Sequence, residues 1–152
     1  MLYIVRFVNI SMSLFEEKVA AFMAKNVPSV RKDECAENAI KLMKKHNHRL
    51  ITVINDAGAV IGIIRARGLI KLFSVQSAGL KMIVSEEAFI QNQKMPVSEI
   101  MNSPPIVLNE DDKLSEALTI FAKNDQDIIA IVDKDMKPVG VLDIQDIFTA
   151  AR

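Results

Sequence analysis

The sequence contains few of the residues from which metal centres and disulfides are built. Its 152 residues include one cysteine, Cys35, two histidines, His46 and His48, and no tryptophan. A single cysteine excludes an intramolecular disulfide and a zinc site made of several thiolates. Two histidines without further ligands argue against a transition-metal site. We therefore expect neither a bound metal nor a required cofactor.

Long apolar runs are also missing. None approaches the ~20 residues that a membrane-spanning helix needs. Arg6 interrupts the apolar opening MLYIVRFVNI, and no small-residue cleavage site follows it. Half of the residues are nevertheless hydrophobic, which is ample material for a core. We expect a soluble, cytoplasmic protein with no membrane partner.

The usual signatures of catalysis are absent as well. With only five glycines, the sequence has neither common form of glycine-rich phosphate loop. Cys35 has no arranged histidine or asparagine partner that would make it a nucleophile. The acidic cluster within residues 125–135 lacks the spacing, the glycine and the closing glutamate of a calcium loop. Because no nucleophile–base pair or paired-carboxylate site can be identified, we expect a protein that is not an enzyme.

Neither sign of charge dominates the chain, which has 19 basic and 19 acidic residues. This balance and the scarcity of aromatic residues argue against a nucleic-acid partner. The charges are unevenly spread, because residues 1–96 carry a net +6 and residues 97–152 a net −6. Solvated faces of different composition explain this difference. Two halves that face each other, within one chain or between chains, explain it equally well.

An internal repeat organises the chain. Residues 19–73 and 97–151 align without a gap at a shift of 78. Repetition at this scale implies units that bury apolar faces against each other. We expect a first domain over 19–73 and a second over 97–152. The identical pairs are Val19 and Val97, Met23 and Met101, Asp33 and Asp111, Ala39 and Ala117, Ile51 and Ile129, and Gly62 and Gly140.

Each repeat is predicted to have the element order β-α-β-β-α, which makes the fold class α/β (α+β). Proline favours an extended first segment, acids near the helix start suit its cap and dipole, and tight turns join the next two strands. The predicted strands are 28–30, 50–54 and 60–64 in the first repeat, and 106–108, 128–132 and 138–142 in the second. The helices carry apolar faces with Ala36, Ala39, Ile40, Leu42 and Met43, with Leu69, Ile70 and Phe73, with Leu114, Ala117, Leu118 and Phe121, and with Ile144, Ile147 and Phe148.

Two segments lie outside the repeats. Residues 1–18 are expected to form an N-terminal extension, with a strand over 2–9 and a helix over 13–24 that leads into the first repeat. Residues 74–96 join the repeats and contain two apolar clusters. This connector is too apolar for a free linker, so we expect it to pack.

This order of elements, with a glycine in the last strand of each repeat, resembles a tandem pair of cystathionine-β-synthase (CBS) domains, also called a Bateman module. The resemblance covers residues 19–151, and its most specific parts are the segments VSEIM, IIAIVDKDMKPVGVLDIQD and ITVINDAGAVIGIIRARG. The family pattern after the second hairpin strand is glycine, two apolar residues, Thr or Ser, two residues and then Asp. It implies two CBS repeats packed as a pseudo-twofold pair. It also implies adenosine-containing ligands in clefts between the repeats, where the Asp holds the ribose hydroxyls.

The second repeat keeps most of this pattern, because Asp146 holds the ribose position. Asp143 replaces the usual Thr or Ser, and its carboxylate would repel a nearby phosphate. By the same resemblance, the walls of this cleft come from the first repeat, and Arg49 is the best phosphate partner near Asp143. The predicted ligand-binding residues are Pro28, His48, Arg49, Thr52, Gly140, Val141, Asp143 and Asp146.

The first repeat departs further, since Gly68 stands where the family has the ribose-binding Asp. Arg65 takes the Thr or Ser position and Arg67 follows two residues later. Such a cleft attracts an anion or stays empty. The residues predicted for this second cleft are Arg65, Arg67, Ile106, Asp127 and Ala130.

Simpler roles exist for these residues. Asp143 and Asp146 also suit the N-terminus of the last helix, and Arg65 and Arg67 suit a solvated surface. One functional hypothesis is a regulatory sensor that binds AMP, ATP, adenosine or S-adenosylmethionine, with its output through a separate effector protein. The alternative is a module with degenerate sites that serves oligomerisation or protein interaction without a nucleotide. The resemblance implies a homodimer in either case.

Overall fold

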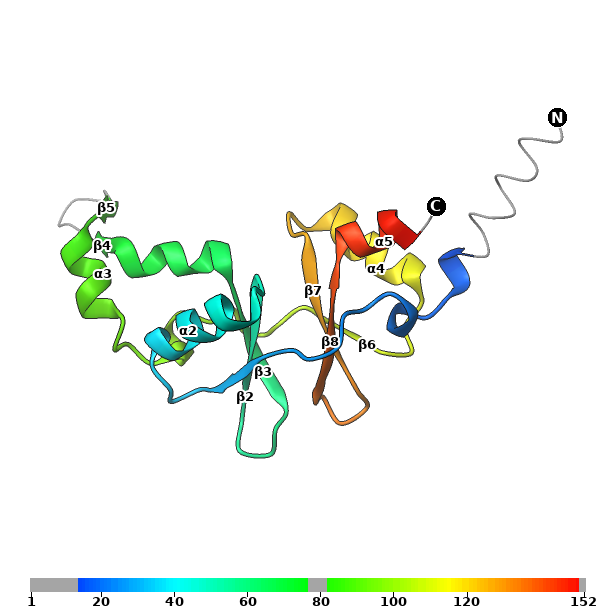
Figure 1. Ribbon diagram of the computed structural model, residues 1–152, viewed down its shortest axis with the longest axis horizontal. Helices are drawn as coiled ribbons and strands as arrows, with labels where there is room; N and C mark the ends of the chain where they lie inside the picture. The colour runs from blue at the N-terminus through cyan, green and yellow to red at the C-terminus, as the bar shows by residue number, and fades with distance from the viewer. Residues whose placement is uncertain (1–13, 77–81, 151–152) are drawn as a thin grey trace, which may run out of the picture. The chain divides into compact units, whose positions relative to one another are not determined.

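The computed structural model describes residues 14–76 and 82–150, which belong to two compact units (Figure 1). One unit consists of residues 27–105, and the other joins residues 106–152 to the chain that precedes residue 27. Each unit contains a three-stranded sheet and helices. The predicted α+β class is therefore confirmed.

The unit of residues 27–105 contains the elements of the first repeat. Its sheet has the order β1-β2-β3, with β1 (Ser29–Arg31) parallel to β2 (Leu50–Ile54) and β2 antiparallel to β3 (Val60–Arg65). Helix α2 (Ala36–His46) crosses from β1 to β2. The predicted final helix is present over Ala66–Phe73 as the 3-10 helix η2.

The other unit repeats this plan. β6 (Val107–Asn109) lies parallel to β7 (Ile128–Val132), which is antiparallel to β8 (Pro138–Asp143). Helix α4 (Leu114–Lys123) joins the first two strands, and α5 (Ile144–Ala150) follows the third. The apolar face predicted for α4 is confirmed, since Leu114, Ala117 and Phe121 lie in the core.

The acids near the start of α2 and α4 close the turn that follows the first strand. Glu34 accepts a hydrogen bond from the backbone N–H of Arg31 at 2.6 Å, and Asp112 accepts one from Asn109 at 2.8 Å. These contacts are equivalent in the repeat. The expectation that these acids cap the helices is wrong, because the N-cap residues are Cys35 and Lys113 and neither caps through its side chain.

The connector after η2 forms a small lobe. β4 (Ser74–Gln76) pairs antiparallel with β5 (Met82–Val84), and helix α3 (Glu86–Asn92) follows. Phe89 of α3 stacks on Phe73 with ring centroids 4.2 Å apart. Asn92 donates a side-chain hydrogen bond to the carbonyl of Leu72 at 2.8 Å. These contacts fix α3 against the end of η2 (Figure 1).

The chain that precedes the first strand of each repeat packs on the sheet of the other repeat. Residues 14–26, here called the N-terminal strap, pair with β8: Ala24 and Val141 exchange two backbone hydrogen bonds of 2.8 and 2.9 Å. Asn102 and Ile63 do the same at 2.8 and 3.1 Å, after the 3-10 helix η3 (Val97–Glu99). A continuous helix over 13–24 is therefore wrong, since residues 14–16 are helical but the helix is interrupted at residues 17 and 18, before the short 3-10 helix η1 (Val19–Ala21). The strand predicted over 2–9 lies outside the described residues.

A glycine permits each of these close approaches. A Cβ on Gly140 would lie 2.7 Å from the carbonyl oxygen of Ala24 and 2.7 Å from the sulfur of Met23. A Cβ on Gly62 would lie 2.5 Å from the sulfur of Met101. The two glycines shared by the repeats are thus the points over which the preceding segments pass.

Exposed ion pairs also hold the strap to the start of α4. Lys18 lies 2.9 Å from Asp111, and Lys113 lies 2.7 Å from Glu16. The hydrogen bond to Glu16, and then its charge, raise the pKa of Lys113 above its usual value. The stabilisation from this ion pair is therefore fully present below the pKa that Lys113 has in the unfolded chain. It is lost as the pH rises through the pKa of Lys113 in the folded protein.

Candidate functional site

The acidic residues of the second repeat meet at the junction of β8 and α5. Asp143 accepts a hydrogen bond from the backbone N–H of Gln145 at 2.9 Å, and Asp146 Oδ2 accepts one from the N–H of Asp143 at 3.3 Å. This reciprocal pattern is that of a capping box. Among residues 14–76 and 82–150, Asp146 Oδ1 has no hydrogen-bond partner. Asp146 therefore holds the helix end with one oxygen and offers the other.

The equivalent junction of β3 and η2 has the opposite charge. Arg65 ends β3 and Arg67 lies exposed in the first turn of η2. Gly68 takes the position of Asp146, and a Cβ placed on it would meet no atom within 4 Å. The junction has lost its carboxylate without filling the space, so a larger side chain fits there.

Of the wall residues predicted from the first repeat, Pro28 directly precedes β1, His48 and Arg49 precede β2, and Thr52 lies within β2. Thr52 is 0% exposed and its hydroxyl lies 2.6 Å from that of Ser29 and 3.3 Å from the carbonyl of Pro28, to which it donates. This hydroxyl therefore links β1 to β2. His48 is half-buried and Arg49 exposed at the start of β2. Both follow Asn47, whose left-handed φ of 52° ends α2.

The remaining predicted residues differ in their exposure to solvent. Gly140, Val141 and Ala130 are buried in their sheet. Ile106 and Asp127 are exposed, and the carbonyl of Asp127 accepts the N–H of Ile144 at 2.8 Å. Each predicted cleft takes residues from both units, so its grouping remains a prediction.

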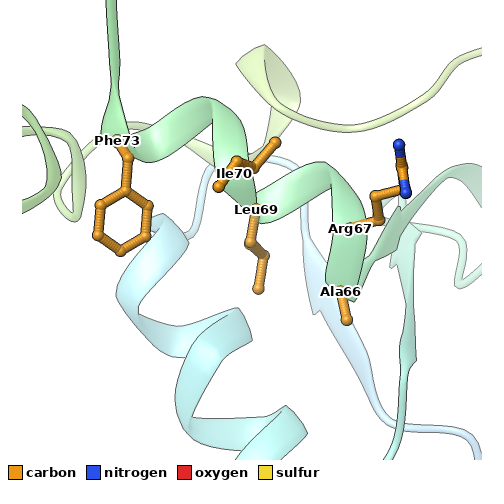
Figure 2. Close-up of a pocket in the computed structure, with 5 residues that line it drawn as sticks. All are labelled: Ala66, Arg67, Leu69, Ile70 and Phe73. Atoms are coloured by element: carbon orange, nitrogen blue, oxygen red, sulfur yellow. The ribbon is translucent and has the colours of Figure 1, made fainter. Parts of the chain in front are cut away.

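The structure adds a cavity that the sequence did not indicate. It has a volume of about 500 Å³ and lies along η2 (Figure 2). Its lining is formed by Ala66, Arg67, Leu69, Ile70 and Phe73. The spacing of Leu69, Ile70 and Phe73 along one helix is the signal that the sequence offers, but the same spacing is typical of a face packed in a core. Ile70 instead remains 57% exposed.

Residues 14–76 and 82–150 contain no group of three or more His, Cys, Asp or Glu side chains arranged to hold a metal ion. The helices within these ranges are all too short or too polar to cross a bilayer.

Comparison with known proteins agrees with this fold. The chain is 25% identical over 131 residues to the uncharacterized protein MJ1225 of Methanocaldococcus jannaschii, covering 86% of this chain and 46% of the relative. The chain thus spans about half the length of that relative. The crystal structure of MJ1225, described as a putative archaeal homolog of g-AMPK, matches with a TM-score of 0.76 over 97% of this chain and 52% of that one.

Two solved structures with bound ligands have the same fold. The CBS domain pair of protein MJ0100, in complex with 5-methylthioadenosine and S-adenosyl-L-methionine, is 21% identical, covers 88% of this chain and 94% of that chain, and has a TM-score of 0.68. CBSX2 in complex with AMP is 22% identical, covers 88% and 95%, and has a TM-score of 0.69.

The sequence model of the CBS domain matches this chain twice, over residues 19–75 and 97–152. These ranges contain both β-α-β-β-α units of the structure. The chain therefore belongs to the CBS domain family and carries a pair of such domains.

Proposed function

We propose that this CBS pair is a regulatory module that binds one adenosine-containing ligand through its second repeat. The observation that carries the proposal is the carboxylate of Asp146. It follows β8 at the ribose-binding position of the family pattern, and its Oδ1 atom has no hydrogen-bond partner among the described residues. A carboxylate oxygen in this state can accept a hydrogen bond from a ribose hydroxyl.

The relatives support the class of ligand. MJ0100 is complexed with 5-methylthioadenosine and S-adenosyl-L-methionine, and CBSX2 with AMP. All three contain adenosine. For this chain, Asp143 favours adenosine or the cationic S-adenosylmethionine over ATP, because its carboxylate repels a phosphate near the ribose 5′ side. AMP binds well only if Arg49 compensates for that charge.

The proposed output is a change of arrangement that a separate effector protein detects. A ligand shifts such an equilibrium when it binds one arrangement more tightly than the other.

We further propose that the protein acts as a homodimer. Residues 27–105 carry a net charge of +4 and the rest of the chain −4, so opposite charges can meet across a contact between copies. Sedimentation velocity at increasing salt tests this, because a dimer held partly by charge weakens as salt screens it.

An interaction module without a nucleotide is the second candidate. Gly68 favours it, since the first repeat lacks the ribose carboxylate. The two candidates differ in one result: only the sensor binds adenosine compounds.

Isothermal titration calorimetry with adenosine, AMP, ATP, 5-methylthioadenosine and S-adenosylmethionine tests the proposal. Hydrogen bonds to a charged group contribute about 1.5–3 kcal/mol each. We therefore expect Asp146→Ala to weaken binding by about tenfold or more. Asp146→Asn keeps one oxygen and removes the charge, so its loss should be smaller.

Asp135→Ala is the matched control, because Asp135 is an exposed acid in the turn between β7 and β8. It should bind as tightly as the wild type. Circular dichroism of each variant without ligand separates lost binding from lost folding. If none of the five compounds binds at millimolar concentration, the sensor proposal fails and the interaction module takes its place.

A further inference from the structure

The cavity along η2 combines an apolar wall with one basic side chain (Figure 2). Ala66, Leu69, Ile70 and Phe73 supply the wall, and Arg67 is the charged residue. A volume of about 500 Å³ is within the range of roughly 300–1,000 Å³ typical of small-molecule sites. Such sites are mostly apolar, with a few polar groups that orient the ligand.

Contacts with α3 and the residue before it hold the apolar wall in place. Phe73 stacks on Phe89 with an angle of 6° between the rings. Two hydrogen bonds of 2.8 Å fix the backbone at the end of η2. Asn92 Nδ2 donates to the carbonyl oxygen of Leu72, and the N–H of Ser85 donates to the carbonyl oxygen of Phe73. Leu72 is fully buried, which fixes how η2 faces the core. A ligand would therefore meet a wall that is already ordered, which reduces the entropy cost of binding.

The charge around the cavity selects the ligand. Among the described residues that line it, Arg67 is the one charged side chain and none is acidic. Within the described ranges, Arg67 has no hydrogen-bond or ion-pair partner. An exposed guanidinium beside an apolar wall complements a carboxylate, sulfonate or phosphate attached to an apolar body.

We propose that this cavity binds a small organic anion with an apolar body, held by Arg67 at its charged end and by Ile70 and Phe73 along its length. The site differs from the one at Asp146 and does not depend on the proposed function. Ile70, which is 57% exposed, would lose part of that exposure to the ligand.

Fluorescence titration with 1-anilinonaphthalene-8-sulfonate tests the proposal on the full chain, since this organic anion becomes fluorescent in apolar surroundings. Arg67→Gln removes an exposed charge contact and should weaken binding by about threefold to fivefold. Ile70→Ser should weaken it by about fivefold. Octanoate should displace the probe at lower concentration than the uncharged 1-octanol does.

The controls share the chemistry of the two variants but lie outside the cavity. Lys71→Gln changes an exposed cation of the same helix, and Ile90→Ser changes a side chain that is 62% exposed on α3. Both should bind the probe like the wild type, and so should Asp146→Ala. Equal losses in the controls, no probe binding, or displacement of the probe by adenosine would overturn the proposal. It is also overturned if Ile70→Ser changes the oligomeric state while the probe does not bind, because the surface then holds another copy.

Discussion

Gly140 lies within β8 and Gly68 within η2, and the two glycines have opposite surroundings. A Cβ on Gly140 would lie 2.7 Å from the backbone oxygen of Ala24, whereas one on Gly68 would touch nothing within 4 Å. Gly140→Ala should therefore lower the free energy of unfolding by about 1–3 kcal/mol, because the strap must move to make room. Urea denaturation followed by circular dichroism measures the difference.

Gly68→Ala is the matched control for this substitution. It should be neutral or raise the free energy of unfolding by about 0.4–1 kcal/mol, since the unfolded chain loses freedom and the folded chain meets no clash. Equal destabilisation by both substitutions would mean that the approach of the strap does not explain Gly140.

Asp143 should control which adenosine compound binds. Asp143→Thr removes the carboxylate but keeps an oxygen that can cap α5. Relative to the wild type, the variant should bind AMP more tightly, while adenosine, which has no phosphate, should change little. Calorimetric titrations with the two ligands give the ratio, and an equal change for both would refute the charge argument.

At the residue scale, the sequence was sufficient to locate the candidate carboxylates but not their hydrogen bonds. Alignment of the two repeats pairs Asp146 with Gly68. The sequence predicts that Asp143 and Asp146 suit the start of the last helix, and the structure adds which backbone N–H each carboxylate accepts, at 3.3 Å for Asp146 and 2.9 Å for Asp143. The exposure of Ile70 could not be predicted either, because its helical spacing is the same whether the face is covered or open.

Among the elements, strands and long helices were predictable. The N-terminal strap and residues 97–102, which pair with β8 and β3, were not. Apolar runs and the turn residues between them identify β2, β3, β7 and β8 within one residue of their observed bounds. In the N-terminal strap, Val19, Phe22 and Met23 have the spacing of a helix face, yet they pack on the core from the short 3-10 helix η1 and the residues just after it. A pairing of single residues leaves no periodic pattern in the sequence.

Backbone hydrogen bonding should make the N-terminal strap necessary for one unit and residues 97–102 necessary for the other. Ala24→Pro removes the N–H that Ala24 donates to Val141, and Asn102→Pro removes the equivalent donor to Ile63. Each should lower the free energy of unfolding by about 1–3 kcal/mol, because a carbonyl loses its partner. Ala24→Ser keeps the N–H and should differ little from the wild type. Urea denaturation of the three variants checks this, and similar losses for Ala24→Ser and Ala24→Pro would contradict it.

For the whole molecule, the repeats of the sequence and the compact units of the structure have different boundaries. The sequence repeats begin at residues 19 and 97. The compact units change at Val27 and Ile106 instead. The core of the first unit includes Val97 and Ile100, which precede the second repeat's first strand. Cutting the chain between the two sequence repeats would therefore remove Val97 and Ile100 from the core of the first unit.

This difference predicts which fragments fold. Residues 27–105 are continuous in sequence and contain the whole core of their unit, so this fragment should unfold cooperatively in urea. Residues 1–75 lack Val97 and Ile100, and this fragment should not form a stable fold. A cooperative transition in 1–75 with a midpoint as high as that of 27–105 would contradict the assignment of the units.

The central claim is that the second repeat keeps a ribose-binding carboxylate that the first repeat has lost. The number of ligands bound per chain tests it most directly, measured by calorimetry with the tightest of the five adenosine compounds. The wild type should bind one ligand and Asp146→Ala none. Gly68→Asp should bind two, because it restores the carboxylate where a Cβ meets no atom within 4 Å. Undiminished binding by Asp146→Ala, or two ligands on the wild type, would contradict the claim.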